Sequence, residues 1–359
     1  MSRKWFAKAT VAALALSIVL AGCGGAKKEE PAPAPAPAKT EPAPAAPAQP
    51  AFKVGMATDL GGLNDESFNA AANEGLKKAK ADLKAEIQAI ESKRMEDYEP
   101  NFKSLMDLKY DLIWGIGFLM QDAITKVAKE NPNQKFAIID AVVASPNVAS
   151  VTFKEQEGSF LMGIIAAKTT KTKKVGFVGG MDFDVIWHFD AGFQAGVKAV
   201  DPTIEVKRVY TGTFTEPTKG KDAALAMLKD GVDVVFHAAG ATGNGVIEAA
   251  AAEKKFAIGV DKDQNKLAPE WVISSMMKRV DVGVFDVSKA TKEGNYPGGK
   301  VIVLGLKENG VGYAPSTLWN KMPAGTKELV DKWAEAIKSG KVVVPENMDK
   351  LKTWEVPKI

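Results

Sequence analysis

The chain alternates short apolar runs with longer amphipathic segments, and this alternation is the strongest constraint on its fold. Apolar strands separated by helices are typical of parallel sheets that are buried on both faces. The sequence therefore predicts a doubly wound α/β architecture. The expected strands are residues 52–58, 86–92, 111–117 and 136–140 in a first series, and residues 174–180, 205–212, 233–240 and 256–261 in a second series.

The two series share residues at a constant spacing. Three pairs of positions are 121 residues apart, and Asp111 and Asp233, which begin equivalent strands, are 122 apart. Several matches at one spacing indicate two similarly wound lobes. The three pairs are Phe68 with Phe189, Gly75 with Gly196, and Asp140 with Asp261.

The remaining elements come too late in the chain to form a third domain. They are an apolar run at residues 271–278, a helix at about 279–292, residues 300–314 and a final helix at 325–340. We expect them to return and complete the two sheets, so that several crossings form a hinge. The predicted first lobe is 52–152 with about 265–304, and the second is 153–264 with about 305–359.

The first residues have the pattern of a targeting segment rather than of folded structure. Three basic residues precede a short apolar run, and the segment ends in Leu20-Ala21-Gly22-Cys23. This ending resembles a bacterial lipobox, in which cleavage precedes a lipid-bearing cysteine. Residues 1–22 are therefore predicted to be a lipoprotein signal peptide. Cys23 is the only cysteine and the predicted site of lipidation, although an incidental thiol is the alternative.

Residues 23–51 are rich in alternating proline and alanine, a composition that favours extended polyproline II and cannot pack a core. A tether between the anchor and the folded lobes is the preferred interpretation, and a recognition segment is the alternative. Removal of residues 1–22 would take away three basic residues, leaving 44 basic and 44 acidic residues. This balance gives no reason to expect nucleic-acid binding.

Open α/β sheets bind ligands beyond the carboxyl ends of their strands, and two facing lobes can close on a ligand. The loop after the first strand, DLGGLNDESFN at residues 59–69, has more polar groups than a turn requires. Capping of the next helix by Asn64 or Asp65 accounts for part of them. Asp59, Phe68 and Asn69 are therefore candidate ligand contacts, with Phe68 as a stacking ring or, alternatively, a core residue.

Two aspartates and a second aromatic residue stand at strand ends. Asp140 and Asp261 end equivalent strands, so both are expected to face the cleft, with a turn or a cap as the alternative. Carboxylates there accept hydrogen bonds from ligand O–H or N–H groups. Phe236 is expected to sandwich a flat ring with Phe68, since offset stacking adds about 0.5–1.5 kcal/mol beyond burial. Burial in the core is the alternative for Phe236.

The loop GATGNG at residues 240–245 follows another strand. Val246 and Ile247 occupy the positions where a P-loop needs Lys and Ser/Thr, so a nucleotide hydrolase is excluded. Gly240 is nevertheless expected to bring backbone N–H groups close to a ligand. Lys278 follows SSMM and is expected to donate to a ligand oxygen or to balance Asp261, unless it is a plain surface lysine.

Catalysis finds little support in the sequence. There are two histidines, His188 and His237, and no cysteine besides Cys23. We find no zinc-ligand spacing, nucleophile elbow or triad-like set. No metal and no cofactor are expected, and the protein is predicted not to be an enzyme.

Several motifs in order resemble the basic membrane protein family of substrate-binding lipoproteins. They are GLNDESFN, DVVFHAAGATGNGV, AIGVDKDQ, SSMMKR and LGLKENGVGY, and the likeness runs from about residue 52 to the C-terminus. The resemblance implies a type I periplasmic-binding-protein fold that serves an ABC importer for nucleosides. It also implies that Phe68 and Phe236 stack on the base and that Asp140 reads the base edge. Asp59 and Asn69 would add polar contacts, and Asp261 would bind the ribose near Gly240 and Lys278.

The expected function is capture of a nucleoside, preferably a purine nucleoside, in the interlobe cleft. The protein would be a lipid-anchored monomer on the extracytoplasmic face of the cell membrane, and its partners would be an ABC permease and ATPase. A sugar or other small polar solute is the first alternative, followed by a nucleoside-processing enzyme and by a sensor or adhesin. Trp187 and His188 are bulkier than expected for the family and have no assigned role.

Overall fold

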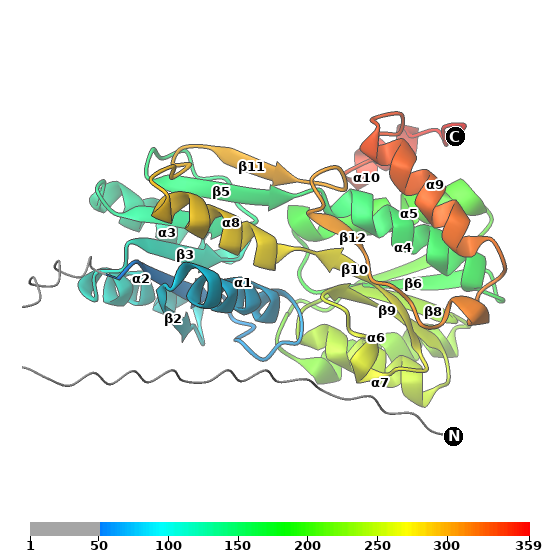
Figure 1. Ribbon diagram of the computed structural model, residues 1–359. Coiled ribbons are helices and arrows are strands. Elements are labelled where there is room, and N and C mark those ends of the chain that lie inside the picture. The colour runs from blue at the N-terminus through cyan, green and yellow to red at the C-terminus, as the bar shows by residue number, and fades with distance from the viewer. Residues whose placement is uncertain (1–50) are drawn as a thin grey trace, which may run out of the picture. The chain divides into compact units, whose positions relative to one another are not determined.

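Two six-stranded sheets, each covered by helices, make up residues 51–359, which this computed structural model describes (Figure 1). The predicted signal peptide at residues 1–22, the anchor at Cys23 and all but the last residue of the predicted tether lie outside the described residues. No helix within residues 51–359 is long and apolar enough to cross a membrane.

The first sheet has the strand order β11-β5-β4-β3-β1-β2, and its pairings are parallel. Because successive strand residues point to opposite faces, Trp114 packs toward α8 whereas Ile113 packs toward α2 and α3. The elements of this lobe are β1 (Lys53–Thr58), α1 (Phe68–Leu83), β2 (Glu86–Glu91), α2 (Tyr98–Asp107), β3 (Leu112–Ile116), α3 (Gln121–Glu130), β4 (Lys135–Ile139), β5 (Val148–Phe153), α8 (Val280–Lys292) and β11 (Val301–Leu304).

The second sheet repeats this winding with the order β12-β10-β9-β8-β6-β7, and only β12 runs antiparallel to its neighbour. The predicted pair of doubly wound lobes is therefore confirmed. The elements of the second lobe are α4 (Glu155–Thr169), β6 (Lys174–Gly179), α5 (Asp184–Val200), β7 (Glu205–Tyr210), α6 (Pro217–Lys229), β8 (Val234–Ala238), α7 (Thr242–Ala252), β9 (Phe256–Asp261), β10 (Val272–Lys278), β12 (Val311–Tyr313), α9 (Thr326–Lys338) and α10 (Met348–Thr353).

Helices α4 and α5 pack closely on one face of the second sheet. A Cβ atom added at Gly163 would lie 2.1 Å from the carbonyl oxygen of Phe193, and one at Gly196 would lie 2.0 Å from that of Phe160. Glycine at these two positions therefore lets the helix backbones approach. Short 3₁₀ segments at Met95–Asp97, Phe118–Met120, Asn265–Leu267 and Trp319–Lys321 complete the described elements.

Within the described residues the chain crosses between the sheets three times, after β5, after β10 and between β11 and β12. The expected hinge of several crossings is thus present. One predicted boundary was wrong, because residues 265–278 were assigned to the first lobe. β10 pairs with β9 in the second sheet, so the return to the first lobe begins at Arg279. The apolar pattern of β10 predicts a strand but does not specify its partner.

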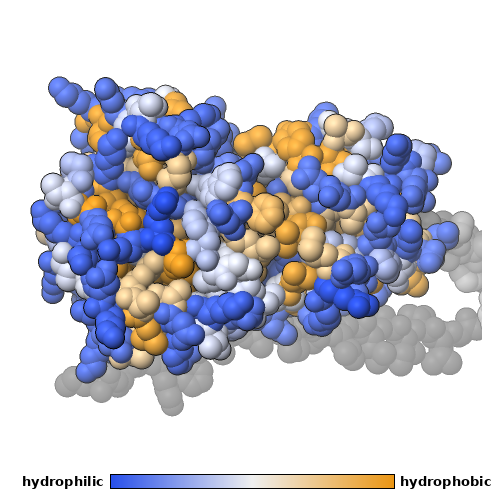
Figure 2. Space-filling model, turned by 180° about the vertical axis from the view of Figure 1, so that it is seen from behind, coloured by the Kyte–Doolittle hydropathy of each residue, from blue (hydrophilic) through white to orange (hydrophobic). Residues whose placement is uncertain are grey.

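The surface is mixed in character. Figure 2 shows hydrophilic residues over most of one face, with hydrophobic residues exposed in separate groups. Such a mixture is usual, because apolar atoms contribute a large share of any folded protein's surface.

Candidate functional site

A cavity with an empty volume of about 530 Å³ lies between the lobes, at the carboxyl ends of the parallel strands. This figure counts all the empty space among the lining atoms, including space open to solvent. The first lobe lines the cavity with Asp59, Gly61, Asp65, Phe68, Asn69, Gly117, Phe118 and Asp140. The second lobe lines it with Val185, Ile186, Phe189, Phe214, Ala238, Ala239, Gly240, Val260, Asp261 and Lys278.

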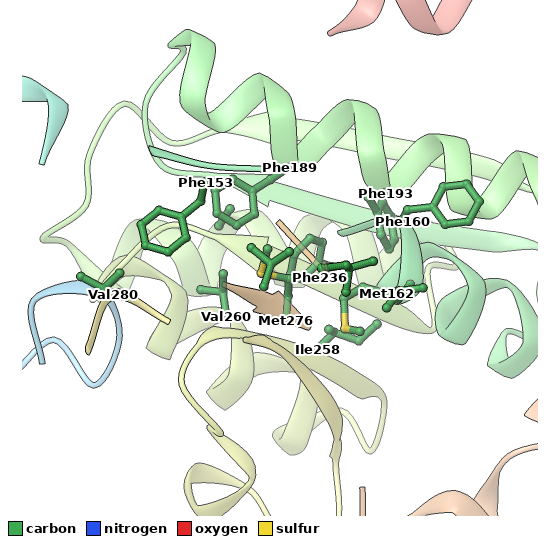
Figure 3. Close-up of a cluster of buried hydrophobic side chains, with 14 of the residues drawn as sticks. Phe153, Phe160, Met162, Phe189, Phe193, Phe236, Ile258, Val260, Met276 and Val280 are labelled. Atoms are coloured by element: carbon green, nitrogen blue, oxygen red, sulfur yellow. The ribbon is translucent and has the colours of Figure 1, made fainter. Parts of the chain in front are cut away.

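Seven of the eight residues predicted as ligand contacts line this cavity, and Phe236 does not. Phe236 is fully buried in the core, with its ring centroid 5.3 Å from that of Phe193 and 5.6 Å from that of Phe177 (Figure 3). The prediction that Phe236 stacks in the cleft was therefore wrong. Phe236 is the middle residue of β8 and points under α5, whereas the cavity lies beyond the end of the strand. The seven that line the cavity are Asp59, Phe68, Asn69, Asp140, Gly240, Asp261 and Lys278.

The second lobe supplies its aromatic wall from Phe189 on α5 instead. The amino group of Lys278 lies 5.2 Å from the ring centroid of Phe68 and 5.5 Å from that of Phe189. The 121-residue repeat pairs Phe189 with Phe68, so the sequence did contain the signal for this residue. Phe118 of the first lobe also contacts aromatic rings of the second lobe. Its ring centroid lies 6.2 Å from that of Phe214 and 5.1 Å from that of Phe183.

The loop before α1 is organised by its acidic residues. The Asp65 carboxylate accepts hydrogen bonds from the backbone N–H groups of Ser67 (2.9 Å), Asn69 (2.8 Å) and Ala70 (3.0 Å). This arrangement confirms that Asp65 caps the helix, because those amides have no partner inside it.

A hydrogen bond between two side chains fixes Asn69 in the cavity. Asn69 donates its amide Nδ2 to Asp59 Oδ1 at 2.7 Å, which leaves Asn69 Oδ1 buried and without a partner among the described residues. Gly117 closes over this pair with a φ of 110°, and a Cβ there would lie 2.7 Å from Asp59 Oδ2. Glycine is therefore required at position 117, both for the backbone and for the space.

Asp140 and Asp261 have the same unusual backbone conformation. Their φ angles are 66° and 65°, in the left-handed region that residues other than glycine seldom occupy. Asp140 directly follows β4, and Asp261 is the last residue of the equivalent strand β9. Both residues line the cavity. Such conformations tend to persist where the position of a side chain matters for function.

Lys278 joins two carboxylates instead of balancing Asp261 alone. Its Nζ lies 2.6 Å from Asp140 Oδ2 and 2.9 Å from Glu155 Oε1, and all three side chains are at most 4% exposed. The carboxylates raise the pKa of Lys278 despite its burial, so it stays charged. Burial raises the pKa of Asp140, and Lys278 opposes this effect. Asp140 Oδ1 remains buried and has no partner among the described residues.

Asp261 and Asp59 are buried and form no ion pair with a described residue, although the charge of Lys278 acts on Asp261 from a greater distance. Burial raises the pKa of Asp261 to about 7 and that of Asp59 to about 6. Ser67 Oγ donates a hydrogen bond to Asp261 Oδ2 across the two lobes. Asp261 therefore takes part in both the lining of the cavity and the contact between the lobes.

The cavity thus offers aromatic walls and buried acceptor atoms, and its lining contains more carboxyl groups than cations. Lys278 is the only cationic residue among the described residues that line the cavity, and two carboxylates already neutralise it. Unpartnered acceptors of this kind pair with N–H or O–H donors. Within residues 51–359 there is no group of three or more acidic, histidine or cysteine residues that could hold a metal ion.

Comparison with known proteins identifies the family of this chain. Residues 52–348 match the family model described as "ABC transporter substrate-binding protein PnrA-like". The chain belongs to this family. The expectation of a basic membrane protein is therefore confirmed, and the protein is the substrate-binding component of an ABC transporter rather than an enzyme.

Three relatives illustrate the match. The "ABC transporter nucleoside-binding protein BmpA" of Lactococcus lactis subsp. cremoris is 38% identical over 82% of this chain and 89% of its own length. "Basic membrane protein A" of Borreliella afzelii is 36% identical over 83% of this chain and 92% of its own. A crystal structure of an ABC transporter solute-binding protein from Aeropyrum pernix K1 matches with a TM-score of 0.75 at 32% identity, over 84% and 96% of the two chains. This likeness confirms the type I periplasmic-binding-protein fold.

Proposed function

We propose that this protein captures a nucleoside, preferably a purine nucleoside, between its lobes and delivers it to an ABC permease and ATPase. The observation that carries the proposal is the pairing of two aromatic walls, Phe68 and Phe189, with unpartnered acceptors at Asn69 and Asp140. A base stacks between aromatic faces and donates from its edge. The name of the Lactococcus relative supports the same substrate class.

The acidic groups explain why a nucleoside suits this cavity better than a nucleotide. Asp261 would accept hydrogen bonds from vicinal ribose hydroxyls, and Asp59, which also lines the cavity, would add a further acceptor. A phosphate would meet several buried carboxylates and no free cation among the described residues. Burial of such a charge without a partner costs several kcal/mol.

The proposed location is the extracytoplasmic face of the cell membrane, where a lipid on Cys23 would anchor a monomer. Residues 23–51 would then act as a spacer of roughly 3.1 Å per residue in the polyproline II conformation. Metabolic labelling with palmitate tests the anchor, which requires label in the wild-type chain and none in Cys23→Ser. Labelling of both chains, or of neither, would contradict an anchor at Cys23.

Thermal unfolding with single ligands tests the substrate. The Cys23→Ser chain is heated with adenosine, guanosine, inosine, uridine, adenosine monophosphate or ribose. A ligand at a hundred times its Kd stabilises the native state by about 2.7 kcal/mol. We expect stabilisation by the purine nucleosides and none by the monophosphate. Stabilisation by ribose alone would instead make the substrate a sugar, and release of free base from inosine would contradict simple binding.

A further inference from the structure

A chain of charged side chains leads from the cavity to a groove on the outside of the molecule. Asp140 Oδ2 contacts Lys278 Nζ at 2.6 Å, and Lys278 Nζ contacts Glu155 Oε1 at 2.9 Å. The other oxygen of Glu155 contacts His188 Nδ1 at 3.2 Å. The side chains of Asp140, Lys278 and Glu155 are 2–4% exposed, whereas that of His188 is 31% exposed.

These four residues come from parts of the chain that meet at the hinge. Asp140 follows β4 of the first lobe, and Glu155 begins α4 at the first crossing between the lobes. Lys278 ends β10 at the second crossing, and His188 lies in the first turns of α5. The chain of contacts therefore spans both lobes next to two of the segments that cross between them.

We propose that His188 is a positioning residue for the ligand cavity: it holds Glu155, Glu155 holds Lys278, and Lys278 fixes the carboxylate with which Asp140 meets the ligand. This inference rests on the proposed nucleoside function. It gives a role to a histidine that does not touch the cavity.

Charge explains why the outermost member matters. Asp140, Glu155 and Lys278 together carry one net negative charge in a buried place, and a protonated His188 neutralises it. When His188 loses its proton, Lys278 is the remaining cation that contacts Glu155, so the ion pair between Glu155 and Lys278 strengthens. Lys278 then holds Asp140 less firmly, so the carboxylate whose unpartnered Oδ1 meets the ligand is less well fixed in position.

The charged groups around His188 determine its pKa. Burial opposes its charge, but the hydrogen bond and charge of Glu155 and the charge of Glu346 raise its pKa overall, while Lys278 acts against them. His188 therefore releases its proton above the ordinary value of 6.5. The same outer groove also contains Asp182, Asp184, Arg208 and Asp349.

Two substitutions at His188 separate positioning from structure. His188→Asn places an amide near the position of Nδ1, so it keeps a hydrogen bond to Glu155 but cannot titrate. His188→Ala removes the contact. Trp187→Phe is the control, because Trp187 lies beside His188 and bonds to Asp182 instead of Glu155. Glu346→Gln lowers the midpoint of the His188 titration without breaking the chain.

The experiment measures the Kd for inosine from about pH 5 to about pH 8.5, where histidine titrates. We expect the Kd of the wild type to rise with pH, because one buried charge-assisted hydrogen bond weakens. Over this range the rise should be about three to ten times larger than the rise for His188→Asn. Since Asp59 and Asp261 titrate in the same range, the difference between the two profiles is the readout. His188→Ala should bind weakly throughout, and Trp187→Phe should match the wild type. Equal profiles for wild type and His188→Asn would overturn the inference.

A second measurement needs no ligand. The carboxyl carbon of Asp140 is followed by NMR in the ligand-free protein and assigned with Asp140→Asn. We expect the titration of Asp140 to move to higher pH in both variants, because both remove the charge of His188, and to move further in His188→Ala, which also removes the hydrogen bond to Glu155. An unchanged titration in His188→Ala would contradict the chain of contacts. Failure of all nucleosides to bind, with this shift present, would sink the proposed ligand but not the role of His188.

Discussion

At the scale of single residues, the proposed function makes the aromatic walls the main determinants of ligand affinity. Phe189→Ala should weaken inosine binding about 10- to 100-fold, because both stacking and buried apolar area are lost. Phe236→Leu should lower the free energy of unfolding by about 1–2 kcal/mol, since it shrinks a core side chain, and should leave affinity unchanged. Calorimetric titration and urea unfolding of both variants check this. Loss of affinity in Phe236→Leu alone would restore Phe236 as the stacking residue.

Asp261 illustrates a conflict between stability and binding. Its pKa of about 7 exceeds the ordinary 3.8, so between these values the native state holds a proton that the unfolded chain has lost. Stability contributed by this group is therefore present at acidic pH and lost as pH rises through 7. Each pKa unit corresponds to about 1.4 kcal/mol.

The prediction is that Asp261→Asn stabilises the ligand-free protein above pH 7 by a few kcal/mol, since no buried charge then forms. The same variant should bind inosine at least tenfold more weakly, because an amide is a poorer acceptor for ribose hydroxyls. Urea unfolding at about pH 5 and about pH 8, combined with titration, measures both. A variant less stable than wild type at the higher pH would refute the assigned pKa shift.

At the scale of elements, the first helix depends on a cap that precedes it. Asp65→Ala should lower the free energy of unfolding by about 1–2 kcal/mol, because three backbone N–H groups lose their acceptor. Asp82→Ala near the other end of α1 is the control, since its pair with Lys78 is exposed. Urea unfolding compares the two, and equal losses would show that the capping bonds contribute nothing.

The elements and their order could be predicted from the sequence, because strand and helix patterns alternate and repeat. The repeat also placed Asp140 and Asp261 correctly at the cavity. The direction of Phe236 could not be predicted, because a continuous apolar strand does not reveal which residues face which layer. Glu155 was missed for another reason. Its partner Lys278 is far away in sequence, and only the meeting of two crossings brings them together.

At the scale of the whole molecule, the lobes are held together over the cavity. Asn244 Nδ2 donates to the carbonyl of Asp65 at 3.1 Å, and Gln264 Nε2 donates to that of Glu66 at 3.1 Å. Lys266 pairs with Glu66 at 2.6 Å. These contacts join the loop before α1 to the second lobe, so they exist only when the lobes are close. Ligand affinity therefore includes the fraction of molecules that is closed.

Asn244→Ala should raise the apparent Kd for inosine about three- to fivefold, because it removes one contact that favours the closed state without touching the cavity lining. Asn101→Ala is the matched control, since Asn101 donates a comparable bond to Ser92 within the first lobe. Small-angle X-ray scattering should show a larger ligand-free radius of gyration for Asn244→Ala than for Asn101→Ala, and equal values with saturating inosine. Unchanged affinity and dimensions in Asn244→Ala would mean that closure depends on the ligand alone.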